Sequence, residues 1–411
     1  MIYIMLRGAL SCLLLLLTAA SAAAQDCVTD EDCGLLGDCN AGACVCDPGW
    51  VGPHCASLNL LPAPADSGLR QKNSSNWCGT ILPDENDAEL FHSYNADFGG
   101  CLDGLNIWTT GSRVIHSTSR GAPEGPYTPL WVNGGAEVAV AAQAHNPQAI
   151  RAPDGTYLLM DSYNGPDAGC TLQANYSTCR GVPGGGMCKP KMPGNGGWGW
   201  WVFHHSASPG GPWAPVNVSV DFPCFSENLT PSPGFHPNGS FFIVFHCDSD
   251  KTHGMCDLTM VRGDTWRGPL VRVNDRIWDS SGVGPHPEDP FFWFRTSPSS
   301  GETSWHVILH NTPRGIHLFS RDGLNFTLQQ ALGEGEGAQP VGPFVFDEVV
   351  LLETSEPCGA AGAPCPNFTA ARRERPWMLF YAQSSRPRVL VTSMQAGSVF
   401  PQVFTHAQRV G

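Results

Sequence analysis

The sequence predicts an all-β protein, a five-bladed β-propeller preceded by a small disulfide-rich module. A unit made of a polar motif, a strand-like run, a turn and a second strand recurs five times along the chain. Asn-Gly or Asp-Gly between apolar runs, as at Asn238-Gly239 and Asp154-Gly155, is typical of β-hairpins. Gly and Pro number 47 and 35 of the 411 residues, as suits a turn-rich chain. Five hairpin-bearing repeats favour a propeller or solenoid over a sandwich.

The fourth repeat shows the pattern most clearly. Residues 286–293 place Glu288, Asp289 and a proline directly before an aromatic, strand-like run. The polar motifs of the other four repeats begin near Asn76, His145, Thr230 and Glu374. Each later half-repeat, for example residues 112–119 and 315–320, has the alternation of an outer blade strand. We therefore expect each polar motif to open the innermost strand of one blade.

Composition and charge indicate the size of the core, the kinds of partner that are disfavoured and the compartment of the protein. A hydrophobic fraction of 42% supports a large core, enough for one β domain and a module. The net charge of −14 disfavours nucleic acid as a partner, because nucleic-acid binding needs basic patches. The 17 cysteines indicate an oxidising compartment.

The first 24 residues have the layout of a secretory signal peptide. Arg7 precedes an apolar run at 9–18, and small residues at 22–24 form a cleavage site. The alternative, a membrane anchor, requires about 20 apolar residues. No later stretch is long and apolar enough to span, so we expect a secreted, extracellular chain without a membrane span. Glycosylation sequons stand at Asn73, Asn175, Asn217, Asn228, Asn238, Asn325 and Asn367, which indicates a glycoprotein.

Residues 25–56 form the predicted disulfide-rich module. Its six cysteines are Cys27, Cys33, Cys39, Cys44, Cys46 and Cys55. Spacing alone allows 15 connectivities. The stretch from 44 to 55, with Gly49, Trp50 and Gly52 between its last two cysteines, closely resembles an EGF-like module. That resemblance implies the bridges Cys27–Cys39, Cys33–Cys44 and Cys46–Cys55. So small a unit depends on cross-links for stability.

We expect this module to act as a spacer or as a contact surface for an extracellular protein. Residues 57–75 are rich in Pro, Ala and Ser and are predicted to be a linker, so the propeller spans 76–411. Ten further cysteines lie in the propeller, and five bridges are the simple expectation. Cys247–Cys256 and Cys358–Cys365 are favoured because they are local.

The second domain resembles the five-bladed propellers of glycoside hydrolase family 43 and its arabinanase, levansucrase and invertase relatives. The resemblance rests on the repeats and on the motifs His145-Asn146-Pro147 and Glu288-Asp289-Pro290. It implies that the polar motifs face a central channel, where carboxyl groups cleave a glycosidic bond. One carboxyl must hold a proton for the leaving group while another is ionised.

The chain departs from the family pattern in its first three blades. The resemblance implies an Asp, an Asp and a Glu there, but the motifs offer Trp77, Asn146 and Thr230. Acids stand instead in blades four and five. The predicted catalytic residues are Glu288, Asp289 and Glu374. Because neighbours on a strand point to opposite faces, we expect only one of Glu288 and Asp289 to face the channel.

The predicted substrate-binding residues are Trp77, His145, Asn146, Thr230 and Arg375. Arg375 and His145 would bind sugar hydroxyls or set the pKa of a carboxyl, and Trp77 would stack on a sugar face. In the alternative interpretation, the acids form salt bridges that hold the blades together. Some family relatives carry a central ion, which His145 would hold, but no ligand spacing requires one. We therefore predict no metal and no cofactor.

Three functions remain open from the sequence. The first is a carbohydrate-active protein that hydrolyses glycosidic bonds at the channel. The second is a non-catalytic glycan-binding or adhesive protein that has lost the family's carboxylates. The third is an extracellular protein-interaction module. Fold analogy does not decide among them.

Overall fold

The computed structural model is nearly all-β. It describes residues 27–64, 66–71, 74–99, 108, 112–132, 135–136, 138–142, 144–163, 200–221, 230–247, 257–278, 288–310, 315–329, 343–344, 349–350, 352–353, 368–369, 372–382, 384–395 and 403–411. The predicted signal peptide and the favoured bridges Cys247–Cys256 and Cys358–Cys365 fall on residues or side chains outside this part.

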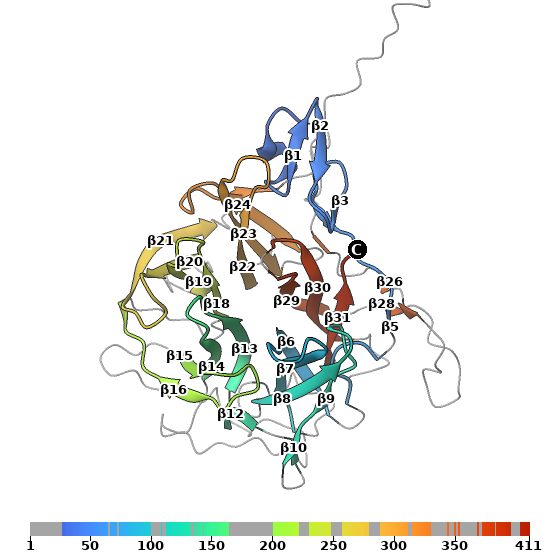
Figure 1. The fold of residues 1–411 in the computed structure, drawn as a ribbon, viewed down its shortest axis with the longest axis vertical. Coiled ribbons are helices and arrows are strands. Elements are labelled where there is room, and N and C mark those ends of the chain that lie inside the picture. Colours follow the sequence, from blue (N-terminus) through green and yellow to red (C-terminus); the bar gives the residue numbers. More distant parts are fainter. Residues whose placement is uncertain are drawn as a thin grey trace, which may run out of the picture.

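Five antiparallel sheets surround a common axis, which confirms the predicted five-bladed propeller (Figure 1). Blade one holds β6 (Asn76–Pro83), β7 (Leu90–Asp97), β8 (Arg113–Arg120) and β12 (Val138–Ala142), with β9 (Thr128–Pro129) beside β8. Blade two holds β13 (Ala144–Arg151), β14 (Tyr157–Tyr163), β15 (Trp200–Ser206) and β16 (Ala214–Val216). Blade three holds β18 (Ser232–Phe235), β19 (Phe241–Cys247), β20 (Asp257–Gly263) and β21 (Leu270–Trp278), with β17 (Val220–Asp221) parallel to β21.

Blade four holds β22 (Glu288–Thr296), β23 (Thr303–His310), β24 (Ile316–Ser320) and β25 (Thr327–Leu328). Blade five holds β29 (Arg372–Phe380), β30 (Pro387–Gln395) and β31 (Val403–Arg409). Short pairs form between β10 (Trp131–Val132) and β11 (Gly135–Ala136), and between β26 (Val349–Val350) and β28 (Phe368–Thr369). The first strands of the blades, β6, β13, β18, β22 and β29, lie nearest the axis (Figure 1).

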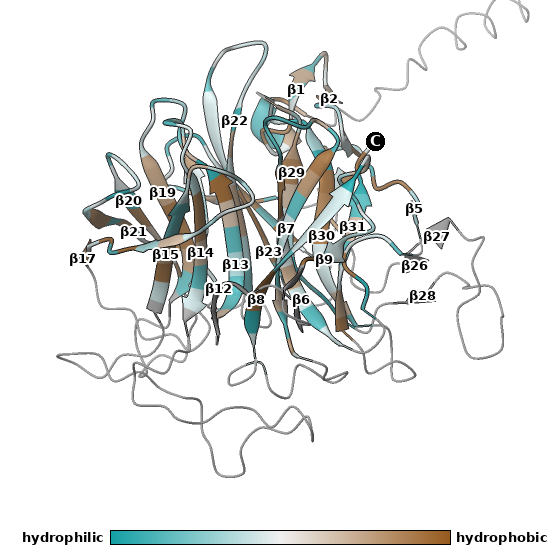
Figure 2. Cartoon of the chain, turned by 60° about the horizontal axis from the view of Figure 1, so that its bottom comes forward, coloured by the Kyte–Doolittle hydropathy of each residue, from teal (hydrophilic) through white to brown (hydrophobic). Residues whose placement is uncertain are grey.

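Apolar layers between neighbouring blades form the core. Phe203 of blade two packs with Phe241 of blade three. Phe242 of blade three packs in turn with Phe292 and Trp305 of blade four. Figure 2 shows such hydrophobic residues along much of β19. Because successive side chains of a strand point to opposite faces of the sheet, blade three packs against blade two on one face and against blade four on the other. Blades that pack in this way stack around the axis.

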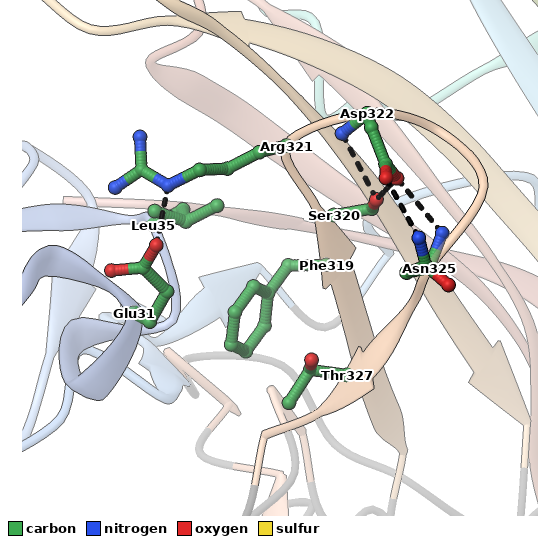
Figure 3. A pocket seen from close by; sticks show the side chains of 8 residues that line it. All are labelled: Glu31, Leu35, Phe319, Ser320, Arg321, Asp322, Asn325 and Thr327. Carbon is green, nitrogen blue, oxygen red and sulfur yellow. Dashed lines mark hydrogen bonds and ion pairs between the residues drawn. The ribbon is translucent and has the colours of Figure 1, made fainter.

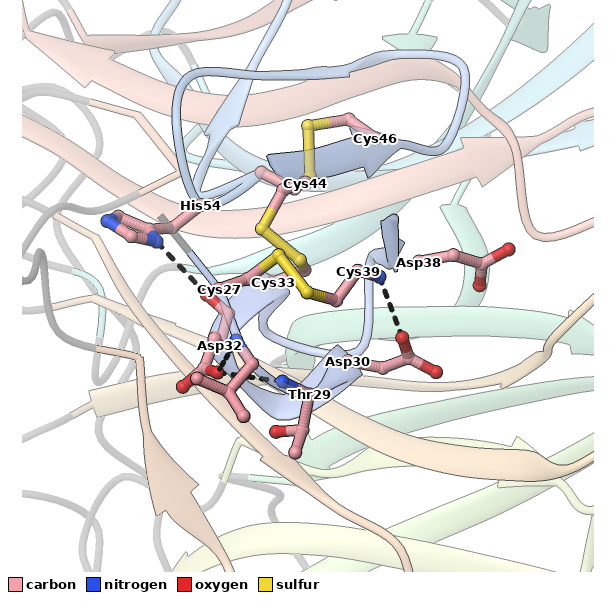
Figure 4. Close-up of a disulfide and its surroundings, with 12 residues drawn as sticks. Cys27, Thr29, Asp30, Asp32, Cys33, Asp38, Cys39, Cys44, Cys46 and His54 are labelled. Carbon is pink, nitrogen blue, oxygen red and sulfur yellow. Dashed lines mark hydrogen bonds between the residues drawn. A yellow bond between two sulfur atoms is a disulfide. The ribbon is translucent and has the colours of Figure 1, made fainter. Parts of the chain in front are cut away.

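The N-terminal module has the predicted disulfide connectivity. Its bridges are Cys27–Cys39, Cys33–Cys44 and Cys46–Cys55 (Figure 4). A single turn of 3-10 helix, η1 (Asp30–Cys33), precedes the hairpin of β1 (Gly37–Asn40) and β2 (Ala43–Cys46), and β3 (Trp50–Val51) pairs with β4 (Ser57–Leu58). Three bridges in so short a segment are consistent with an extracellular protein.

The segment at 57–75, for which a linker is predicted, packs along blade five. Its strand β5 (Ala63–Pro64) runs parallel to β27 (Leu352–Glu353). Leu60 and Leu69 form bridges with Val410 and Thr405. Leu69 is 1% exposed, so this segment contributes to the core of the propeller.

One expectation about the propeller cysteines is wrong. Cys78 has a free, buried thiol, so the ten cysteines of this domain do not form five bridges. Its strand β6 is the innermost of blade one, where the thiol packs among Trp77, Ala96 and Phe98. Of the helices in the described ranges, none has the length and apolar character needed to cross a membrane.

Candidate active site at the propeller axis

Four of the five innermost strands share one irregularity at their start. Cys78, Asn146, Asp289 and Arg375 have φ values of 45°, 55°, 57° and 56°. Each lies where the strand slips by a residue against its neighbour, as a β-bulge does. Residues other than glycine rarely adopt a positive φ, and bulges change the direction of side chains near functional sites. Four of the five polar motifs of the sequence are therefore bulges at the axis.

Side chains from blades three, four and five meet at these bulges. Arg375 Nη1 lies 2.9 Å from Asp289 Oδ1 and donates to Thr230 Oγ1 at 3.0 Å. The Thr230 hydroxyl donates in turn to Asp289 Oδ1 at 3.1 Å. On the other side, the Cys78 thiol lies 3.8 Å from Asn146 Oδ1 and joins blades one and two. The structure thus brings motifs from all five repeats to the axis.

His310 connects the acids of blades four and five. It ends β23, directly opposite Glu288 in the register of the hairpin. Its Nδ1 lies 3.5 Å from Asp289 Oδ2, and its Nε2 lies 3.9 Å from Glu374 Oε1. His310 was not among the predicted site residues, because it lies outside the polar motif that opens its repeat. The hairpin register was the signal that could have found it.

The side chains of Glu288 and Asp289 both lie close to His310. The donor atoms of Glu288, Asp289 and His310 all lie within 4.8 Å of one another. The expectation that only one of the two acids faces the site is wrong, because the bulge at Asp289 interrupts the alternation on which it depended. Glu288 is partly exposed, whereas Asp289 is 1% exposed.

The surroundings move the pKa values of these groups in opposite directions. Burial raises the pKa of Glu374, although the positive charges of His310 and Arg372 oppose the shift. Burial also disfavours ionisation of Asp289, but the charge of Arg375 and the contact with His310 outweigh it and lower the pKa of Asp289. Glu374 is therefore harder to ionise than Asp289, and acid–base chemistry needs carboxyls that differ in this way.

The charge of His310 depends on the same acids. Burial lowers its pKa, but the contact with Asp289 and the nearby charge of Glu374 outweigh burial, so the pKa of His310 is raised. Arg372 approaches the cluster from the outside, with its Nε 2.9 Å from Glu374 Oε1. A carboxylate at Glu374 would thus lie beside the guanidinium of Arg372 and the imidazole of His310.

His145 and Trp77 are part of the packing around the axis. His145 is 2% exposed, with Nδ1 2.7 Å from Ser112 Oγ and its ring 5.3 Å from that of Trp108. Burial and the charge of Arg375 lower its pKa, so the imidazole is neutral. Trp77 is 1% exposed, and this burial contradicts the expectation that its ring stacks on a sugar.

One donor set in the described part of the chain suits a metal ion. Glu288, Asp289 and His310 offer two carboxylates and an imidazole, ligands that divalent first-row metals accept. The guanidinium of Arg375 already occupies Asp289 Oδ1, which leaves Oδ2 on the side of the histidine. His145 belongs to no such group among the described residues.

Comparisons with known proteins identify the N-terminal module. Residues 29–57 match the Teneurin-like EGF domain. No curated protein matches the sequence.

Solved structures with a similar chain path include propeller glycosidases. A protein of unknown function from Dyadobacter fermentans is 11% identical over 84% of this chain and 97% of that one, with a TM-score of 0.49. The family 117 glycoside hydrolase Zg3597 of Zobellia galactanivorans is 10% identical over 86% and 89%, with a TM-score of 0.48. The GH43 protein BlXynB of Bacillus licheniformis is 11% identical over 84% and 54%, with a TM-score of 0.43. Likeness at this level does not bear on the residues at the axis.

Proposed function

We propose that the chain is a secreted carbohydrate-active protein whose acids at the propeller axis hydrolyse a glycosidic bond. One observation carries the proposal. His310 lies between Asp289 and Glu374, so acids from blades four and five share one cluster in which their pKa values are shifted in opposite directions. A carboxyl with a raised pKa beside further carboxyls is the arrangement from which a glycosidase draws its general acid.

Each acid has a distinct role in this proposal. Glu374 holds a proton and donates it to the glycosidic oxygen as the bond to the anomeric carbon breaks. Glu288, which is partly exposed, supplies the carboxylate that acts on water or on the anomeric carbon itself. Water provides the hydroxyl group of the new reducing end and returns a proton to the pair.

Asp289 serves as a positioning residue. Arg375 and Thr230 hold its Oδ1, and its Oδ2 faces His310. Its negative charge raises the pKa of His310 beside Glu374. Arg375, Thr230, His145 and Asn146 support this arrangement from neighbouring blades, where all four are buried.

A second candidate is a glycan-binding or adhesive protein without catalysis. The observation that favours it is the absence of acids from the first three motifs, where the axis holds Cys78, Asn146 and Thr230. In addition, Arg375 and Arg372 neutralise the two buried carboxyls of the cluster. An extracellular protein partner bound through the EGF-like module is compatible with either candidate.

A glycan array followed by an assay for reducing ends separates these candidates. The protein recovered from medium is first tested for binding, and every bound glycan is then incubated with it. The proposal expects new reducing ends, their loss in Glu374→Gln and Glu288→Gln, and retained binding in both variants. Glu302→Gln is the control, because Glu302 is exposed and pairs with Arg321 away from the axis. Binding without release of reducing ends would favour the second candidate, and no binding at all would contradict both.

A further inference from the structure

A pocket of about 210 Å³ lies between the EGF-like module and blade four (Figure 3). The module contributes Glu31 and Leu35, and blade four contributes Phe319, Arg321 and the turn that follows. Leu35 and Phe319 are 3% and 4% exposed and give the pocket an apolar base. Arg321 spans its rim, where it is paired with Glu31. The pocket thus combines an apolar surface with charged and hydroxyl groups at its edge.

A glycosylation sequon forms part of the wall of this pocket. Asn325 and Thr327 of the motif Asn325-Phe326-Thr327 both line it, and both are exposed. Asp322 fixes the turn, because its Oδ1 accepts the Asn325 backbone N–H at 2.8 Å. Its Oδ2 accepts the side-chain Nδ2–H of Asn325, also at 2.8 Å. An asparagine that carries a glycan keeps one hydrogen on Nδ2, so a modified Asn325 still has a donor for Asp322.

We propose that Asn325 carries an N-linked glycan whose first N-acetylhexosamine lies in this pocket and joins the module to blade four. The sugar is amphipathic. Its ring and acetyl methyl suit the surface of Phe319 and Leu35, and its hydroxyl and amide groups suit Arg321 and Thr327. Each of the seven sequons of the chain is a candidate for glycosylation. Asn325 also has a pocket beside it that can hold the first sugar.

The covalent step is the transfer of an oligosaccharide from a polyprenyl diphosphate donor. The bond between the anomeric carbon and the diphosphate oxygen breaks, and the diphosphate leaves with the electron pair. The bond from Asn325 Nδ2 to the anomeric carbon forms, and one amide proton is released. No oxidant or reductant takes part. The proposal requires export of the chain and is independent of any catalysis at the axis.

The glycan would act on an interface that is already built from several contacts. Arg295 pairs with Asp47, and its Nη2 lies 2.9 Å from Asp47 Oδ1. Gln329 Nε2 donates to the carbonyl of His54 at 2.6 Å. Both contacts are partly buried, whereas the pair of Arg321 and Glu31 at the pocket is exposed. A sugar there would contact both the module and blade four and would slow the local opening of η1.

The test uses the full chain recovered from the medium of a host that glycosylates exported proteins. Mass spectrometry of the peptide with Asn325 is expected to show a glycan, and enzymatic removal is expected to convert Asn325 to Asp. Hydrogen exchange at the backbone amides of residues 31–36 should then become roughly threefold to tenfold faster. Exchange in blade two should not change.

Variants provide the matched controls. Thr327→Ala removes the sequon and should reproduce the faster exchange, whereas Thr327→Ser keeps both the sequon and the slow exchange. Asn217→Gln removes an exposed sequon outside the pocket and should leave residues 31–36 unchanged. An unmodified Asn325 in the exported protein would overturn the proposal. Equal exchange before and after removal of an observed glycan would overturn its docking in the pocket.

Discussion

Trp50 of the EGF-like module stacks on Trp293 of blade four, with ring centroids 6.3 Å apart and planes inclined by 8°. The same indole lies 6.0 Å from the ring of His317. Trp50 is 3% exposed and belongs to one apolar core with Phe291 and Trp377 of blades four and five. Module and propeller therefore share a core, and the module is expected to stabilise the blade on which it lies.

Replacing Trp50 by Ala tests this shared core. The change removes a large buried aromatic side chain and should lower the free energy of unfolding by about 3–5 kcal/mol. Urea unfolding followed by fluorescence and by circular dichroism measures the loss. Val51→Ala is the matched control, because Val51 is 39% exposed and its loss should cost less than about 0.5 kcal/mol. Equal losses in the two variants would contradict a shared core.

The junction should also weaken in acid. His306 Nδ1 lies 3.0 Å from His317 Nε2, and His317 Nδ1 lies 2.6 Å from Gln329 Oε1, which leads to the module. Burial lowers the pKa of His317 from 6.5 to about 4 and holds that of His306 well below its usual range. As the pH falls below 6.5, these histidines bind protons in the unfolded chain but stay neutral in the folded protein. The free energy of unfolding therefore decreases from pH 6.5 down to the lowered pKa values.

Unfolding measurements between pH 7 and pH 4.5 test this histidine pair. Each histidine contributes a slope of up to about 1.4 kcal/mol per pH unit. His317→Gln cannot titrate, so its stability curve should be flatter than that of the natural protein over this interval. His205→Gln is the control, because His205 is only partly buried and lies on blade two. Parallel curves for the natural protein and His317→Gln would contradict a neutral, buried pair.

Asp289→Asn should destabilise the centre of the propeller. It leaves the buried guanidinium of Arg375 without its carboxylate, a loss of about 3–5 kcal/mol. Since the folded pKa of Asp289 is lowered, its contribution is present above the ordinary value of 3.8 and is lost as the pH falls through the folded pKa. The difference between the two proteins should therefore shrink in acid.

Asp264→Asn is the control for this pair. Asp264 pairs with Arg262 at 3.3 Å, but its side chain is 93% exposed, so the change should cost no more than about 1 kcal/mol. Thermal unfolding at pH 7 and at pH 3 measures both variants. A loss for Asp289→Asn as small as that of the control would show that the axial pair does not hold blades four and five together.

The Cys78 thiol should be inert until the chain unfolds. It is buried, and burial raises its pKa to about 12, whereas the thiolate is the reactive form. Alkylation of the unreduced protein, followed by mass spectrometry, should label Cys78 only in denaturant. Labelling of the native protein would contradict this burial, and a disulfide at Cys78 would contradict the free thiol.

Local patterns in the sequence predicted the module and the number of blades. The spacing from Cys44 to Cys55 and its resemblance to EGF-like modules gave the three bridges, since such a unit depends mainly on its cross-links. The hairpin turns at Asp154-Gly155 and Asn238-Gly239 marked the blades, because turn chemistry is local.

The site was only partly predictable, because it depends on contacts across blades. Glu288, Asp289 and Glu374 were singled out as acids in polar motifs, but His310 carries no such motif and joins them only through strand pairing. The rule of alternating faces failed at Asp289, where the bulge allows two successive acids to share one cluster. A positive φ is not readable from Cys or Arg, which seldom adopt it.

The pH dependence of kcat/KM on a glycan that the array identifies tests the axial acid cluster most directly. A general acid must be protonated, so the rate should fall as the pH rises through the raised pKa of Glu374, with a midpoint above 4.5. Glu374→Gln should lose this limb together with most of its turnover and should still bind the glycan. A limb that persists unchanged in Glu374→Gln, or a complete lack of turnover on every glycan that the natural protein binds, would contradict hydrolysis at this site.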